Sequence, residues 1–142
     1  MFIDALLKVA SAQAMGAGAV SASSIDLGNV TPKRAIGTGE VMGFGLSIDV
    51  SATVAATLVE VISATDAALT AGILVHSSLT IPLASAVAGT LFYLPIPMGT
   101  PTQRFLGIRT TTAGGTISVS AWLTAQVTFS IASLQYAKNF VA

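Results

Sequence analysis

Cysteine is absent from the 142-residue chain, which excludes disulfide bonds, thiolate metal sites and a cysteine nucleophile. Charged residues are scarce as well: they make up 8% of the sequence, against roughly a quarter in ordinary soluble domains. Six basic and six acidic residues give a formal net charge of zero. Because nucleic-acid binding needs clustered basic residues to neutralise phosphates, we expect no nucleic-acid partner.

A long apolar run is also missing. The hydrophobic fraction is 53%, but Ser, Thr, Gly or Pro interrupts each apolar stretch before it is long enough for a membrane-spanning helix. The opening residues, MFIDALLKV, lack the basic start of a signal peptide, and we expect no membrane partner. A neutral, charge-poor chain self-associates readily. This composition therefore indicates a subunit of a larger assembly, with part of its surface covered by neighbours.

Alternating apolar and polar residues, the pattern of a half-buried strand, run through most of the chain. The pattern is clearest in GFGLSIDV at 43–50 and in TISVSAWLT at 116–124. Further strands are expected at 23–27, 57–63, 73–76, 78–83, 90–97, 103–112 and 126–133, with a turn between the third and the fourth of these. Roughly eight strands with closely spaced turn signals are typical of an all-β sandwich or jelly roll.

Two of these segments carry more specific expectations. Residues 57–63 are apolar on both faces apart from Glu60, which favours a central strand. Residues 90–97 contain Pro95 and Pro97, and because proline cannot donate a ladder hydrogen bond, this strand is expected at a sheet edge.

The domain organisation follows from the strand pattern. We predict one antiparallel, jelly-roll-like β-sandwich at residues 20–132, preceded by an N-terminal arm at 1–19 and followed by a C-terminal arm at 133–142. Within the N-terminal arm, residues 2–15 fit either a helical face or an extended segment.

Residues suited to catalysis are few, and no enzyme or cofactor is expected. GTGEVMG at 37–43 resembles a nucleotide-binding loop, but its glycine spacing is wrong and a strand pattern follows where a helix should begin. His76, the only histidine, cannot form a multi-histidine metal site. As a catalytic base it would need an orienting carboxylate and a nucleophile, so we interpret it as a partly exposed residue at a strand end.

The acidic residues form no local cluster, and Glu60 stands out because its strand is otherwise apolar. A buried carboxylate needs a partner. Arg104 or Arg109 is expected to supply that partner in a structural ion pair.

Aromatic residues are the candidates for an interface, because large rings bury much area at low entropy cost. Trp122 falls on the polar face of its strand, and either an interface role or a β-bulge that returns it to the core accounts for this position. The other candidates are Tyr93 beside the two prolines, Phe2 on the N-terminal arm, and Tyr136 and Phe140 on the C-terminal arm.

Five segments in collinear order resemble a known family. They are IDLG (25–28), IGTGEVMGFGLSIDV (36–50), FYLPIP (92–97), RFLGIRTTTAGGTISVSAWLT (104–124) and the closing QYAKNFVA. Together with the opening DALLKVASAQA, they resemble the tailed-bacteriophage capsid cement, or decoration, proteins of the Bordetella-phage type.

The resemblance implies a structural virion protein without catalytic residues. Such a protein would be a jelly-roll homo-oligomer, a dimer or a trimer, on the outer surface of an icosahedral head, where it clamps adjacent subunits of the major capsid protein. Two alternatives stay open: another phage structural module, such as a tail or fibre subunit, and a small β-barrel that binds an apolar ligand.

Overall fold

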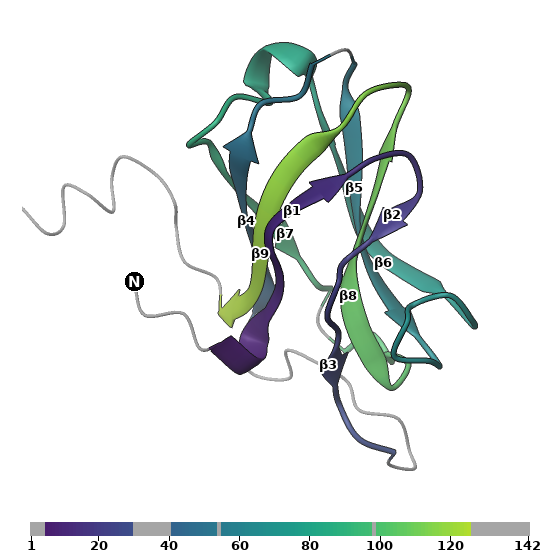
Figure 1. Cartoon of the computed structure of the whole chain (residues 1–142). Helices are drawn as coiled ribbons and strands as arrows, with labels where there is room; N and C mark the ends of the chain where they lie inside the picture. Colours follow the sequence, from purple (N-terminus) through teal and green to yellow (C-terminus); the bar gives the residue numbers. More distant parts are fainter. Residues whose placement is uncertain (1–4, 30–40, 54, 98, 126–142) are drawn as a thin grey trace, which may run out of the picture.

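The computed structural model describes residues 5–29, 41–53, 55–97 and 99–125. Two antiparallel sheets pack face to face (Figure 1). Sheet A has the strand order β1 (Lys8–Met15), β9 (Ile117–Ala125), β4 (Met42–Val50), β7 (Leu91–Pro95). Sheet B has the order β2 (Ala19–Val20), β8 (Phe105–Thr112), β5 (Thr57–Ala64), β6 (Leu74–Ile81), and β3 (Ile25–Asp26) also pairs with β8. Two short 3₁₀ helices, η1 (Ala5–Leu7) and η2 (Leu83–Ser85), lie at opposite ends.

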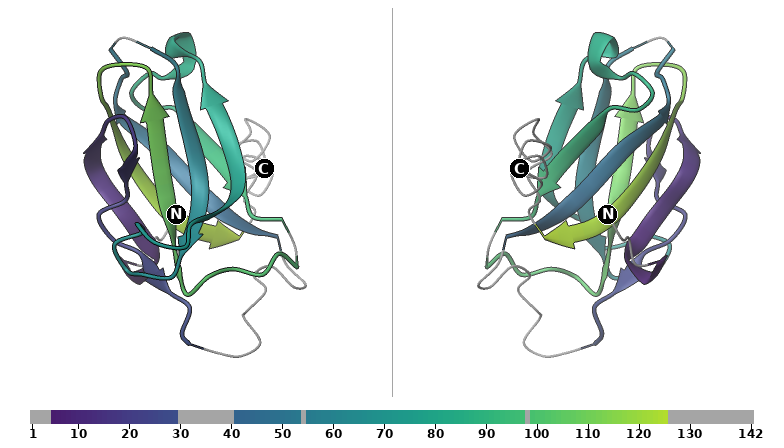
Figure 2. Two further views of the ribbon diagram at one scale, coloured as in Figure 1. Left: turned by 90° about the vertical axis from the view of Figure 1, so that its right-hand side faces the viewer. Right: turned by 90° about the vertical axis from the view of Figure 1, so that its left-hand side faces the viewer.

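The strand pairing is that of a jelly roll. β2 and β3 pair with successive parts of β8 and act as one interrupted strand. The first strand of the chain then pairs with the last, β1 with β9, and the interrupted strand β2/β3 pairs with β8. In the same way β4 pairs with β7, and β5 pairs with β6. This nested pairing produces two Greek keys over two sheets. The fold predicted from the sequence is confirmed, and the left and right views of Figure 2 look onto sheets B and A respectively.

The core lies between the two sheets because each strand turns its apolar positions inward. Phe44, Leu46 and Ile48 of β4 are buried, and the intervening Gly45, Ser47 and Asp49 belong to the outer face. The other strands add buried side chains in the same way: Val59, Val61, Leu106, Ile108, Ile117, Val119 and Ala121. The space between the sheets is filled by these side chains.

Several strand predictions hold. β5 is a central strand between β8 and β6, and β7, which ends at Pro95, is an edge strand of sheet A. Residues 73–83 differ from the prediction, because no turn separates two strands there. β6 is one strand with a register shift against β5 between Val61 and Ile62. A β-bulge of this kind changes the side-chain alternation without breaking the strand.

Part of the predicted N-terminal arm is a strand of the sandwich. β1 pairs with β9 from Lys8 to Met15, and Val9, Ala10 and Met15 are buried in the core. Two register shifts interrupt the pairing, and Ala12 has a φ of 44°. These irregularities hide the period-two pattern in the sequence, which explains why an arm or a helix was expected. The predicted C-terminal arm and the strand expected at 126–133 lie outside the described residues.

Candidate interaction surfaces and internal polar contacts

The outer face of sheet A carries two aromatic residues on adjacent strand positions. Tyr93 of β7, Gly45 of β4 and Trp122 of β9 are direct neighbours in the register. The β4–β9 register is continuous around Trp122. The register shift beside Trp122 in the β1–β9 pairing places its extra residue in β1. β9 therefore has no bulge there, and Trp122 lies on the outward face of its strand.

Two glycines make room for these rings. A Cβ atom on Gly45 would lie 2.7 Å from Cε2 and 2.8 Å from Nε1 of Trp122, and one on Gly43 would lie 2.7 Å from the Tyr93 hydroxyl. The rings therefore lie against the backbone of β4, which only glycine permits at this distance. The alternating glycines of GFG in a predicted strand were a sequence signal for this close approach.

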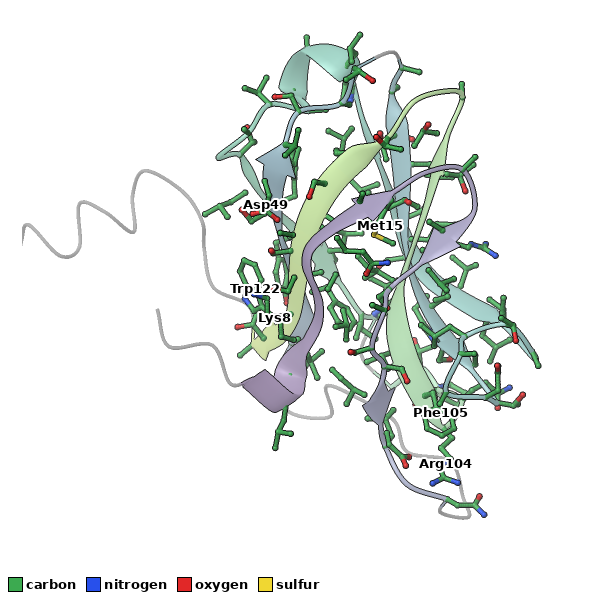
Figure 3. The ribbon with its side chains drawn as sticks, in the orientation of Figure 1. Lys8, Met15, Asp49, Arg104, Phe105 and Trp122 are labelled. Carbon is green, nitrogen blue, oxygen red and sulfur yellow. The ribbon has the colours of Figure 1, made fainter. Side chains whose placement is uncertain are left out.

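Trp122 is buried although it faces outward, since only 5% of the residue is exposed. Lys8 of β1 lies opposite it in the register, and Figure 3 shows the two side by side. The Trp122 indole N–H has no hydrogen-bond partner among the described residues. Because so little of the ring is exposed, Trp122 offers a neighbour only a small contact area. Tyr93 is half-buried, and burial raises the pKa of its hydroxyl.

The predicted ion pair of Glu60 forms with Arg109. β5 and β8 place these residues directly opposite each other, and the Arg109 Nη2 and Glu60 Oε2 atoms are 2.7 Å apart. Arg109 Nε donates to the same carboxylate oxygen. Arg104, the other candidate, is not the partner of Glu60.

Arg104 instead pairs with Asp26, which the sequence did not single out. Its Nε and Nη2 atoms donate to the two carboxylate oxygens of Asp26, each at 2.8 Å. This bidentate bond, with a further hydrogen bond from the Gly28 N–H, lowers the pKa of Asp26 to about 2. The guanidinium group also lies 4.9 Å from the centre of the Phe105 ring, at the lower end of the molecule (Figure 3).

His76 contacts a serine, but not one of its sequence neighbours. Its Nε2 atom is 2.7 Å from the hydroxyl of Ser63 on β5, and the Ser63 oxygen also accepts the N–H of Gln103. Ser63 is fully buried. Burial lowers the pKa of His76.

The described carboxylates all have hydrogen-bond donors away from His76. Glu60 and Asp26 accept from arginines. Asp49 accepts from Ser120, and Asp66 accepts from Thr70 and Ala71. Catalysis by a serine–histidine pair requires a carboxylate that orients the imidazole, and no described carboxylate does so. In the described ranges, no three His, Asp or Glu side chains lie close enough together to hold a metal ion.

The remaining interface candidates lie near the two ends of the chain. Phe2, Tyr136 and Phe140 lie outside the described residues.

Within the described ranges, no helix is long and apolar enough to cross a membrane.

Comparison with known proteins places the chain in a family. A search of curated proteins found no match. The family model of Bbp16 matches residues 9–127, which extend from β1 past the end of β9. Since this match covers most of the chain, the protein belongs to the Bbp16 family.

Proposed function

We propose that this protein is a structural virion protein that binds the outer surface of an icosahedral phage head and stabilises it by clamping adjacent subunits of the major capsid protein. The observation that carries the proposal is the match to the Bbp16 family over residues 9–127, because the family name suggests a Bordetella phage protein. The five collinear segments that resemble phage cement proteins lie largely inside the same range.

The chemistry of the described surface supports a structural role. The described carboxylates and both described arginines form internal hydrogen bonds, so few polar groups are left to converge on a substrate. An enzyme site needs several polar groups converging in a cleft. On this proposal, the protein acts without catalysis and without a cofactor, and its partners are the major capsid protein and further copies of itself.

Repeated weak contacts are sufficient for such a role. Many copies on a lattice gain avidity even when each single contact is modest. A compact jelly roll is a suitable rigid body for this task, although the fold alone does not establish it.

The decisive experiment is a mass-spectrometric inventory of purified phage particles. A stoichiometry near one copy per major capsid protein supports a cement protein. A few copies per particle would support the tail or fibre alternative. Absence from the particle would contradict both.

An apolar ligand is the weaker alternative. A site for one needs a cavity of several hundred Å³, and the space between the sheets is occupied by core side chains. A groove of about 390 Å³ runs along β1, lined by Lys8, Val9, Ala10, Ser11, Gln13, Ala22 and Ser23. Gln13 in its wall donates to the Val20 carbonyl and accepts from the Ala22 N–H, and these bonds join β1 to the end of β2 and the segment that follows it.

A further inference from the structure

One end of the sandwich has connecting loops without charged residues. Its loops are the β1–β2 turn, the β4–β5 connection, the β6–β7 connection with η2, and the β8–β9 turn, which lie at the upper end in Figure 1. The described residues there, called the uncharged end below, are 16–18, 50–53, 55–56, 81–91 and 112–116. They include no Asp, Glu, Lys, Arg or His. The nearest charged residue is Asp49, which borders this end beside Val50, is exposed and accepts a hydrogen bond from Ser120.

Exposed apolar side chains gather at this end. Val50, Leu83 and Val87 are 60%, 42% and 49% exposed, and Leu91 at the start of β7 is 45% exposed. Backbone hydrogen bonds hold the two connections together: Ala52 donates to the Ala86 carbonyl and Gly89 donates to the Ile48 carbonyl. The four side chains therefore belong to two segments that lie side by side.

The opposite end has a different chemistry. It carries Lys8, Asp66 and the ion pair of Asp26 with Arg104. Figure 3 shows Lys8 and Arg104 toward the lower end. Charged groups that are buried against an apolar partner surface lose their hydration without compensation. Such a surface therefore fits the uncharged end better than the charged one.

The size of the apolar patch indicates what kind of partner it suits. Four partly exposed Leu and Val side chains present on the order of 300 Å², a patch size that is often functional on a monomer. A stable two-body interface needs about 800 Å² from each partner. The patch is too small for a stable dimer in solution, but it is sufficient for a contact that is repeated over a lattice.

We propose that the uncharged end is the surface that contacts the phage shell, and that it binds an uncharged, apolar surface on the major capsid protein. This inference rests on the proposed function. It goes further by assigning the shell contact to one end of the sandwich, with Leu83, Val87, Val50 and Leu91 as its apolar contacts.

The test uses two double variants of the full chain. Leu83→Glu/Val87→Glu places charges at the uncharged end. Leu74→Glu/Val75→Glu is the matched control at the start of β6, near the other end. The pairs have the same residue types and the same exposure, 42% for the leucines and 49% for the valines. Binding to purified shells that lack the protein is measured by co-sedimentation, and folding is checked by circular dichroism and thermal melting.

We expect the first variant to bind at least about tenfold more weakly than the wild type, because binding would bury unpaired charges, and the control to bind within about twofold. If the first variant does not fold, Leu83→Ser/Val87→Ser replaces it, with a smaller loss expected. Unchanged binding of the first variant, or loss confined to the control, overturns the assignment. Loss of oligomerisation with shell binding retained also overturns it, since a second copy would then occupy this end. Failure of the wild type to bind shells contradicts the proposed function itself.

Discussion

Gly43 and Gly45 show how single residues shape the outer face of sheet A. Neither is needed for a turn, since both lie inside β4. Their lack of a Cβ atom lets Tyr93 and Trp122 lie against the backbone. Glycine weakens a strand interior, and here the packed aromatic rings offset that cost.

Gly45→Ala tests this arrangement directly. The new methyl group would lie less than 3 Å from three atoms of the Trp122 ring, so the ring must move. We expect a loss of about 1–3 kcal/mol in the free energy of unfolding. Because Trp122 is the only tryptophan, its fluorescence should report the displacement.

Gly16→Ala is the matched control, since a Cβ atom there would meet nothing closer than 3.8 Å. If the two variants lose the same free energy of unfolding, or if the Trp122 emission spectrum is unchanged in Gly45→Ala, the packing described for Trp122 is wrong.

His76 makes the stability depend on pH. Burial lowers its pKa in the folded protein below the ordinary value of 6.5, so the unfolded chain takes up the proton first. The contribution of neutral His76 is therefore fully present above about pH 6.5 and is lost as the pH falls through the lowered pKa. We expect urea-unfolding midpoints to fall between pH 7.5 and 5.

His76→Gln should remove this part of the pH dependence while keeping a polar contact to Ser63. His76 is the only histidine, so the difference between wild type and variant isolates it. If the unfolding midpoint of the variant changes with pH as steeply as that of the wild type, His76 does not cause the effect.

At the scale of elements, β1 belongs to the sandwich. It supplies an edge of sheet A and buries Val9, Ala10 and Met15. The Ala12 N–H donates to the Ser120 hydroxyl, which in turn donates to Asp49. This chain of hydrogen bonds holds the irregular part of β1 against β9 and β4.

Deletion of residues 1–15 should therefore destabilise the fold severely. The lost burial and strand pairing amount to several kcal/mol, comparable with the total stability of about 5–15 kcal/mol of a small domain. Differential scanning calorimetry would show a greatly lowered melting temperature or no transition. A truncated chain that melts like the full one would show that β1 adds nothing to the core.

Deletion of residues 134–142 has the opposite expected outcome. The buried apolar side chains of the described residues already form a core between the two sheets. We expect the fold to remain intact and shell binding or oligomerisation to weaken. Light scattering and shell co-sedimentation measure the two effects, and unfolding of the truncated chain would instead place this segment in the core.

At the scale of the whole molecule, low charge determines how binding should respond to salt. Salt screens contacts between charges and leaves apolar burial intact. With 8% charged residues, the protein is expected to stay on purified shells in molar salt, as measured by co-sedimentation at increasing NaCl. Release by molar salt would mean that ionic contacts dominate.

Much of the fold was predictable because strand patterns are local. Alternation in 43–50 and 116–124 identified β4 and β9 with their inward faces, and Pro95 identified β7 as an edge. The jelly-roll class followed from the number and spacing of such segments. Composition indicated a subunit of a larger assembly, and this stays a prediction.

Contacts between strands were decided only by the tertiary structure. The β5–β8 register places Arg109 opposite Glu60, and β3 places Asp26 beside Arg104. The sequence does not reveal either choice, because Arg104 and Arg109 lie only five residues apart in one segment. In the same way, β1 is recognisable as a strand only through its pairing with β9.

The sequence by itself thus determined the low charge through its composition, and most of the strands with their apolar faces through the order of neighbouring residues. The tertiary structure decided which arginine pairs with Glu60, why an outward Trp122 is buried, and that four connections without charge meet at one end. These properties depend on strands brought together from distant parts of the chain, which no local pattern specifies.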